Sequence, residues 1–211
     1  MDNYFDISFP VFGTEILYDH GYSLFSAISK IIPEYHDTED VAMLQINLQN
    51  VSNGKGRLHR ASRLRFRVNQ HWYKILMSLV GQAIQIKEDS VQLGIPEPRP
   101  LIPSSNLRAR YVIVNVRSAI ENKELYSIDK DSQLREIFGE AIKRQIENLD
   151  ISKQVSFSLG KRKALIIKNK TVVGYELVVN RLSADESIII QQKGIGGRRK
   201  FGAGFFLPIK N

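Results

Sequence analysis

The sequence predicts an α+β protein made of two consecutive units with the same order of elements. Short stretches alternate between apolar and polar residues, as half-buried strands do, and others repeat apolar residues at helical spacing. The order strand, helix, strand, strand, helix, strand occurs in the first half and returns in the second with one extra hairpin. This split βαβ order gives an antiparallel sheet with helices on one face, the ferredoxin-like (RRM-like) topology.

A cluster of prolines separates the two predicted units. Each proline fixes its own φ angle and disfavours helix in the residue before it. We therefore expect an N-terminal ferredoxin-like domain at 1–95, a Pro-rich linker at 96–106 and a C-terminal ferredoxin-like domain at 107–211. The prolines are Pro96, Pro98, Pro100 and Pro103.

The strands of the first half follow from period-two alternation. Tyr4–Phe9 alternates and is ended by Pro10, Met43–Leu48 alternates before the turn-rich segment 51–56, and Ser62–Val68 alternates again. In the last of these, every second residue is an arginine, so three arginines share one face of the strand. They are Arg63, Arg65 and Arg67.

Two helices are expected among these strands. Leu24, Ile28 and Ile31 recur at helical spacing, and Pro33 ends that helix near Ile32. A second amphipathic helix follows the third strand, and strands at Ala83–Lys87 and Ser90–Leu93 complete the half. The apolar residues of this second helix are Trp72, Ile75, Leu76 and Leu79.

The second half begins with a strand at Arg108–Val116 and then a long helix capped at Asp131. Strands are expected at 155–159, 164–167 and 172–179, separated by basic turns at 161–163 and 168–170, with a last strand at Phe205. The apolar residues of the long helix are Leu134, Ile137, Phe138, Ala141 and Ile142.

A glycine-rich basic loop lies between a short helix and the last strand. Ser183 and Glu186 have the spacing of a capping box, which predicts a helix at Ala184–Lys193. In the following segment 194–204, glycines flank Arg198, Arg199 and Lys200, a composition suited to anions. Because the loop follows a helix C-terminus, it differs from P-loops and dinucleotide sites, and loop amides and basic side chains would have to hold phosphate. A flexible, solvated basic turn is the alternative.

Composition limits the kind of partner. The chain has 211 residues, 43% of them hydrophobic, with no apolar run of membrane length and no basic signal segment at its start, so we expect a cytoplasmic protein without membrane contacts. The absence of cysteine excludes disulfides and thiolate metal sites. A net charge of +8 favours a polyanionic partner, nucleic acid before membrane.

The histidines are the strongest candidates for chemistry. His20, His36, His59 and His71 lack zinc-site spacing, so we expect neither a metal nor another cofactor. No nucleophile motif is present, but RNA carries its own nucleophile. An imidazole that takes the 2′-hydroxyl proton, beside a cation that stabilises the phosphorane, suits RNA cleavage.

The chain resembles the CRISPR-associated repeat-RNA processing endoribonucleases, in particular a short subgroup that carries an Asp-His-Gly-Tyr element. The loop matches their pattern of two glycine pairs with five residues between them, Gly194 and Gly196 followed by Gly202 and Gly204. Asp19–Tyr22 before the first helix, a histidine just after it and two ferredoxin-like units complete the resemblance, which spans nearly the whole chain.

The resemblance implies a metal-independent endoribonuclease that cuts precursor CRISPR RNA within each repeat and leaves a 2′,3′-cyclic phosphate and a 5′-hydroxyl. Many members keep the repeat-derived 3′ stem-loop and join an RNA-guided surveillance complex with other subunits. The family's general base is usually a histidine in or just after the first helix, so His36 is the first candidate here and His20 the second. Ser29 stands where several members have a helper tyrosine, and Lys55 is a candidate for their lysine.

The basic elements are candidates for binding the RNA. The glycine loop either contacts RNA phosphates or packs between the two units, and arginines and lysines of one strand and the long helix would grip a stem, whose A-form shape and phosphates are what side chains can read. The RNA-binding candidates are Gly194, Gly196, Gly197, Arg198, Arg199, Lys200, Gly202, Gly204, Arg63, Arg65, Arg67, Arg135, Lys143 and Arg144.

Two other functions fit the same sequence. A tandem RRM-like protein that holds structured RNA without cutting it would need neither histidine. A purely structural subunit of a ribonucleoprotein would need neither histidine nor affinity for free RNA. The sequence has no RRM aromatic motif on a central strand, which places the nuclease first.

Overall fold

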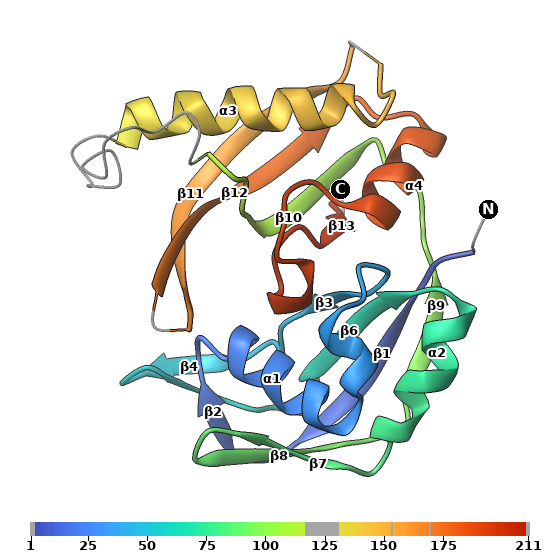
Figure 1. The fold of residues 1–211 in the computed structure, drawn as a ribbon, viewed down its shortest axis with the longest axis vertical. Coiled ribbons are helices and arrows are strands. Elements are labelled where there is room, and N and C mark those ends of the chain that lie inside the picture. The colour runs from blue at the N-terminus through green and yellow to red at the C-terminus, as the bar shows by residue number, and fades with distance from the viewer. Residues whose placement is uncertain (1–2, 117–130, 153, 169, 210–211) are drawn as a thin grey trace. The chain divides into compact units, whose positions relative to one another are not determined.

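The computed structural model describes residues 3–116, 131–152, 154–168 and 170–209 (Figure 1). The chain divides into two compact units. The N-terminal unit comprises residues up to 101 together with the segments 166–170 and 199–202. The C-terminal unit comprises 102–165, 171–198 and the residues from 203 onward.

The sheet of the N-terminal unit has the ferredoxin-like strand order. β1 (Phe5–Phe12) pairs with β6 (Arg63–Val68), and β3 (Ala42–Leu44) lies on the other side of β6. β9 (Glu97–Pro100) pairs with the free edge of β1. If β1, β3, β6 and β9 are counted as the first to fourth strands, their order across the sheet is second, third, first, fourth. All of these pairs are antiparallel, which confirms the predicted fold class.

The fourth strand lies inside the expected Pro-rich linker, so a free linker over 96–106 is a wrong assignment for 97–100. Pro98 lies opposite Ile7 and Pro100 opposite Phe5. Proline has no N–H to donate, and an edge strand tolerates it because only one side of the strand needs donors. The strands expected near 83–93 form a hairpin instead, β7 (Ala83–Ile86) with β8 (Asp89–Leu93), which extends the far end of β1.

The helices of the N-terminal unit follow the predicted positions. α1 spans Gly21–Ile31 and is followed at once by the short 3-10 helix η1 (Pro33–His36). α2 spans Gln70–Leu76 and continues into η2 (Met77–Leu79). The apolar face of the sheet meets them through aromatic side chains, because the ring of Tyr35 stands edge-on to Phe66 at 6.2 Å and to Trp72 at 6.4 Å.

A second, three-stranded sheet occupies segments expected to be loop or turn. Its strands are β2 (Glu15–Leu17), β5 (Lys55–Arg57) and β4 (Gln49–Ser52), in that order across the sheet. The expected strand over 43–48 is correspondingly short and ends at Leu44. These strands have only three or four residues each, too few for an alternating pattern to reveal them.

The C-terminal unit repeats the topology of the first. Its sheet has the order β11-β12-β10-β13, which is again second, third, first, fourth (Figure 1). The elements in chain order are β10 (Asn106–Val112), α3 (Asp131–Glu147), β11 (Ser156–Ile167), β12 (Lys170–Asn180), α4 (Ala184–Lys193) and β13 (Phe206–Pro208).

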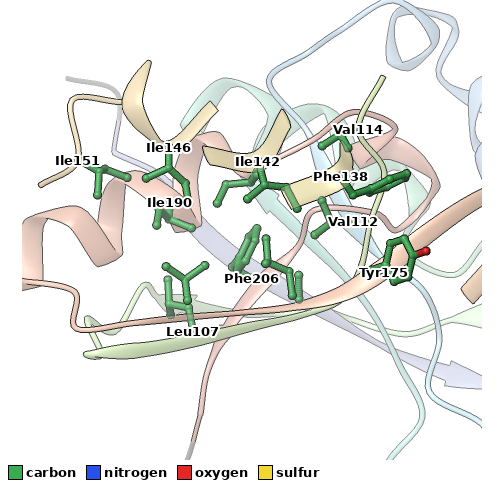
Figure 2. Packing of buried hydrophobic residues seen from close by; sticks show 14 of the residues in the cluster. Leu107, Val112, Val114, Phe138, Ile142, Ile146, Ile151, Tyr175, Ile190 and Phe206 are labelled. Carbon is green, nitrogen blue, oxygen red and sulfur yellow. The ribbon is translucent and has the colours of Figure 1, made fainter. Parts of the chain in front are cut away.

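Both helices of this unit pack on the same apolar cluster as the sheet. Figure 2 shows Phe138 and Ile142 of α3 and Ile190 of α4 facing side chains of the strands. The strands contribute Leu107, Val112, Tyr175 and Phe206, among others. The capping box is confirmed, since the Ser183 hydroxyl accepts from the Glu186 amide at 3.3 Å and the Glu186 carboxylate accepts from the Ser183 amide at 2.8 Å.

The basic turn expected at 161–163 is wrong. These residues lie within β11, which runs without interruption for 12 residues. The three consecutive basic residues Lys161, Arg162 and Lys163 are part of a strand that is partly exposed along nearly all of its length, so they do not need a turn to reach solvent. The strand expected to reach Val116 ends at Val112, and Ile113 forms only an isolated bridge with Gly197.

Candidate active site

His36 ends the 3-10 turn that follows α1, and its imidazole is exposed. The side chain is 62% exposed, and Nδ1 lies 2.7 Å from Oδ1 of Asp37. A carboxylate can only accept, so this contact assigns the proton to Nδ1 and leaves the lone pair on Nε2. Within the described residues Nε2 has no hydrogen-bond partner. An exposed, correctly oriented nitrogen of this kind can act as a general base.

His20, the second candidate base, has no nitrogen available. Its side chain is buried, and Nδ1 lies 2.8 Å from the carbonyl oxygen of Leu17 and 3.0 Å from that of Tyr18, so Nδ1 donates. Nε2 accepts from the amide of Ile46 at 3.0 Å. Taking a substrate proton would require breaking that bond inside the protein. The assignment of His20 as a base is therefore wrong, and the residue fixes the backbone around the start of α1.

The two expected helper residues lie elsewhere. The hydroxyl oxygen of Ser29 is enclosed and has no partner among the described residues, so it presents nothing to an RNA. The ammonium of Lys55 pairs with Asp89 at 2.7 Å and with Glu15 at 3.6 Å, and the hydrogen bond to Asp89 raises the pKa of this lysine. A lysine held by two carboxylates is a poor partner for a phosphate. The structure contradicts both helper assignments.

Lys200 is the basic residue that lies beside His36. It belongs to η6 (Arg199–Phe201) in the glycine-rich loop. Its ammonium donates to the backbone carbonyl of His36 and lies 5.7 Å from the centre of the Phe25 ring, which is itself 5.6 Å from the His36 ring. Partial burial lowers the pKa of Lys200, while the nearby charges of Asp37 and Glu39 oppose that shift.

Gly21 and Tyr22 of the Asp-His-Gly-Tyr element pack against Phe201 of this loop. An added Cβ at Gly21 would lie 2.4 Å from the carbonyl oxygen of Phe201, so only glycine admits the loop at this distance. The same carbonyl accepts from Nε2 of Gln45 at 2.9 Å, and the Phe201 ring stands edge-on to Tyr22 at 5.7 Å and to Phe25 at 4.7 Å. From the sequence, this element was a mark of the family and the source of a candidate base, His20, and its packing role was missed.

The glycines of the loop do not form a phosphate cradle. Each of the five glycine amides already donates to a protein oxygen, at 2.6 to 3.3 Å, so the expectation that they hold RNA phosphates is wrong. At Gly196, φ is +85° and an added Cβ would lie 2.4 Å from the Ile113 carbonyl. The acceptors for Gly194, Gly196, Gly197, Gly202 and Gly204 are Ile190, Gln145, Ile113, Arg199 and Tyr111.

Arg67 and Arg135 both bind groups of the fold. Arg67 is buried and binds the carboxylate of Asp6 through two contacts of 2.8 and 3.1 Å, across the strand pair β1 and β6. Arg135 donates to the Asp131 carboxylate and, through its two terminal nitrogens, to the carbonyls of Leu159 and Gly160. The buried guanidinium of Arg67 is not open to phosphate, so that expected contact is wrong. Arg135 is partly exposed, and its RNA contact stays a prediction.

The other basic candidates differ in exposure. Arg63 donates to the carbonyls of Arg60 and Ser62 and is half-buried, and burial lowers the pKa of Arg65. Burial, with the charge of Arg67 added, lowers the pKa of Arg199 to about 10. Three candidates are exposed and remain predictions for RNA contact: Lys143, Arg144 and Arg198.

The described residues show neither a metal-binding cluster nor a membrane-spanning helix. They contain no group of three or more histidine or acidic side chains arranged to hold a metal ion. None of their helices is long and apolar enough to cross a membrane.

Comparison with known proteins identifies the family. The Cas6 Crispr family model matches residues 5–211. The CRISPR-associated endonuclease Cas6 of Myxococcus xanthus (strain DK1622) is 32% identical over 204 residues, which is 96% of this chain and 80% of that protein. A solved structure named CRISPR associated protein Cas6 matches at 13% identity with a TM-score of 0.64, covering 98% of this chain and 100% of its own.

A further solved structure, described as a RAMP protein binding different RNA substrates, matches at 12% identity with a TM-score of 0.61, over 99% of this chain and 100% of its own. At these identities the structural matches support the fold, with its tandem ferredoxin-like units. The family model and the Myxococcus relative, each covering nearly the whole chain, show that the chain belongs to the Cas6 family of CRISPR-associated proteins.

Proposed function

We propose that this protein is an endoribonuclease that cleaves precursor CRISPR RNA within its repeats by general acid-base chemistry that needs no metal. The observation that carries the proposal is the geometry of His36, whose Nδ1 is held by Asp37, whose side chain is exposed and whose Nε2 has no hydrogen-bond partner among the described residues. The Myxococcus relative, named as an endonuclease, supports the reaction class.

The reaction uses the RNA's own 2′-hydroxyl as the nucleophile. Nε2 of His36 takes the hydroxyl proton, the 2′-oxygen forms a bond to the adjacent phosphorus and the bond from phosphorus to the 5′-oxygen breaks. The 5′-oxygen leaves with a proton from solvent or from a protein group. The products are a 2′,3′-cyclic phosphate on one fragment and a 5′-hydroxyl on the other.

Binding of the repeat depends on charge and shape. The net charge of +8 and the exposed side chains of Lys143, Arg144 and Arg198 suit contacts to the phosphates of a stem. The solved relative described as binding different RNA substrates supports an RNA ligand. The protein would keep the repeat-derived 3′ stem-loop after cleavage and carry it into an RNA-guided complex with other subunits.

The test is cleavage of a labelled repeat RNA in excess EDTA, with analysis of both new ends. We expect one cut, a cyclic phosphate, a 5′-hydroxyl and no cleavage of an RNA with a single 2′-deoxy substitution at the cut site. Loss of cleavage in EDTA that added Mg²⁺ restores, or a cut in the 2′-deoxy RNA, would contradict the mechanism. Tight binding without any cut would make the protein a non-catalytic holder of structured RNA.

A further inference from the structure

We propose that Lys200, carried by the glycine-rich loop, is the catalytic cation of this site, and that it neutralises the charge that grows on the phosphate attacked at His36. This inference rests on the proposed function, since it takes His36 as the base. It assigns to one loop residue a part in the chemical step, beyond a general contribution to RNA affinity.

The first argument is position. The Lys200 ammonium donates to the backbone carbonyl of His36, the residue that also carries the imidazole. A phosphate next to a 2′-hydroxyl that reaches Nε2 therefore comes near the same residue that this ammonium contacts. An ammonium has three N–H groups, and the carbonyl takes one of them. The remaining donors can bind phosphate oxygens.

The second argument is that the loop is held firmly enough to place a charge. On one side of Lys200, the Phe201 ring packs edge-on against Phe25 at 4.7 Å, and its carbonyl accepts from Gln45 at 2.9 Å. The carbonyl of Lys200 itself lies 3.5 Å from the hydroxyl of Tyr35, a fully buried residue. A donor fixed before the substrate arrives stabilises a transition state without the cost of reorganising it.

The third argument is the state of the neighbouring cations. Lys55, the lysine expected from the family resemblance, is held by Asp89 and Glu15. Burial lowers the pKa of Arg199, and the charge of Arg67 lowers it further. Lys200 is half-exposed, and the Phe25 ring below its ammonium favours a positive charge at that place.

The chemical role follows from the charge balance of the step. When the 2′-oxygen bonds to phosphorus, negative charge builds on the two non-bridging oxygens and on the departing 5′-oxygen. Lys200 binds these oxygens through its N–H groups while His36 holds the 2′ proton. Removing one preorganised donor of this kind lowers catalysis by about 10²- to 10³-fold.

The experiment compares three variants in single-turnover cleavage and in RNA binding. In Lys200→Ala we expect the cleavage rate to fall about 10²-fold or more, as for loss of an oxyanion donor, while the Kd for the repeat changes by less than about tenfold, as for loss of one phosphate contact. Lys200→Arg should recover part of the rate. Lys193→Met, which removes one exposed charge from the last turn of α4, is the matched control and should cut as the wild type does.

Chemical rescue separates a catalytic role from a structural one. Added ethylammonium should raise the cleavage rate of Lys200→Ala and leave Lys193→Met unchanged, because a small cation can enter the space left by the side chain. The inference is overturned if Lys200→Ala cuts at the wild-type rate, or if its whole deficit is lost affinity that saturating protein restores. Both results leave the His36 mechanism standing, because that mechanism is tested by the product ends and the 2′-deoxy RNA.

Discussion

His20 immediately precedes α1 and His36 ends the 3-10 turn that follows it, and the two side chains have opposite environments. At the start of the helix, His20 is buried and both ring nitrogens are bound to backbone groups. After its end, His36 is 62% exposed and only Nδ1 is bound. The residue within the conspicuous Asp-His-Gly-Tyr element is the structural one. Hydrogen-bond saturation, which a sequence does not display, decides between them.

The largest expected effect is at the exposed end. His36→Ala should lower the single-turnover cleavage rate by about 10²- to 10⁴-fold, the usual contribution of a general base. RNA affinity and the melting temperature should stay near the wild-type values because the side chain is exposed. His71→Ala, at an exposed histidine of α2, is the control. Equal loss in both variants would remove the distinction of His36.

The next largest effect is expected at Gly21, which packs against the loop that carries Lys200. In Gly21→Ala the new Cβ meets the Phe201 carbonyl at 2.4 Å, and relieving that overlap should destabilise the protein by about 1–3 kcal/mol. Since the carbonyl belongs to the residue after Lys200, cleavage should fall as well. Thermal unfolding and single-turnover rates measure the two effects.

Gly139→Ala is the control for this substitution, because the space around its Cβ is open and the residue lies in a helix, where alanine is favoured. A Gly21→Ala protein that is less stable but cuts at the full rate would show that the loop position does not matter for catalysis.

At the buried end we expect loss of stability with little change in chemistry. His20→Ala leaves the Ile46 amide and the Leu17 carbonyl without partners, which should cost about 1–3 kcal/mol. In a chain of this size, each kcal/mol of lost stability lowers the melting temperature by about 2–4 °C. Cleavage per folded molecule should be unchanged. A folded His20→Ala protein that binds the repeat but does not cut would return His20 to the active site.

The smallest effect concerns the partner of His36. Asp37→Ala removes an exposed pair, and such pairs contribute about 0–1 kcal/mol, so the cleavage rate should fall by no more than about fivefold. The measurement is the single-turnover rate at saturating protein. A loss as large as that of His36→Ala would mean that the carboxylate takes part in the proton transfer itself.

Much of the fold was predictable because burial on one face of a sheet imposes a period of two. β1, β6 and the capping box of α4 follow directly from their residues. β9 was missed because prolines usually indicate a linker, and their tolerance at a sheet edge depends on which neighbour is present. The run 161–163 was interpreted as a turn because of its three consecutive charges, but the strand continues through it.

The site was only partly predictable. The sequence indicated the glycine loop and the histidine after α1, but not that they meet, because Lys200 and His36 are 164 residues apart. Likewise, Arg67 was predicted to bind RNA because the sequence does not show its partner Asp6, which lies 61 residues away on the neighbouring strand. Pairings of this kind arise from packing, and no local pattern reports them.

The assignment of residues 199–202 to the N-terminal unit bears on the order of events during synthesis. A nascent chain that has emerged as far as residue 101 has every strand of the first sheet, but it lacks the lysine beside His36 and the aromatic ring that covers Phe25. His36 is therefore synthesised long before Lys200. If Lys200 is the catalytic cation proposed above, a product that stops before residue 200 should not cleave the repeat.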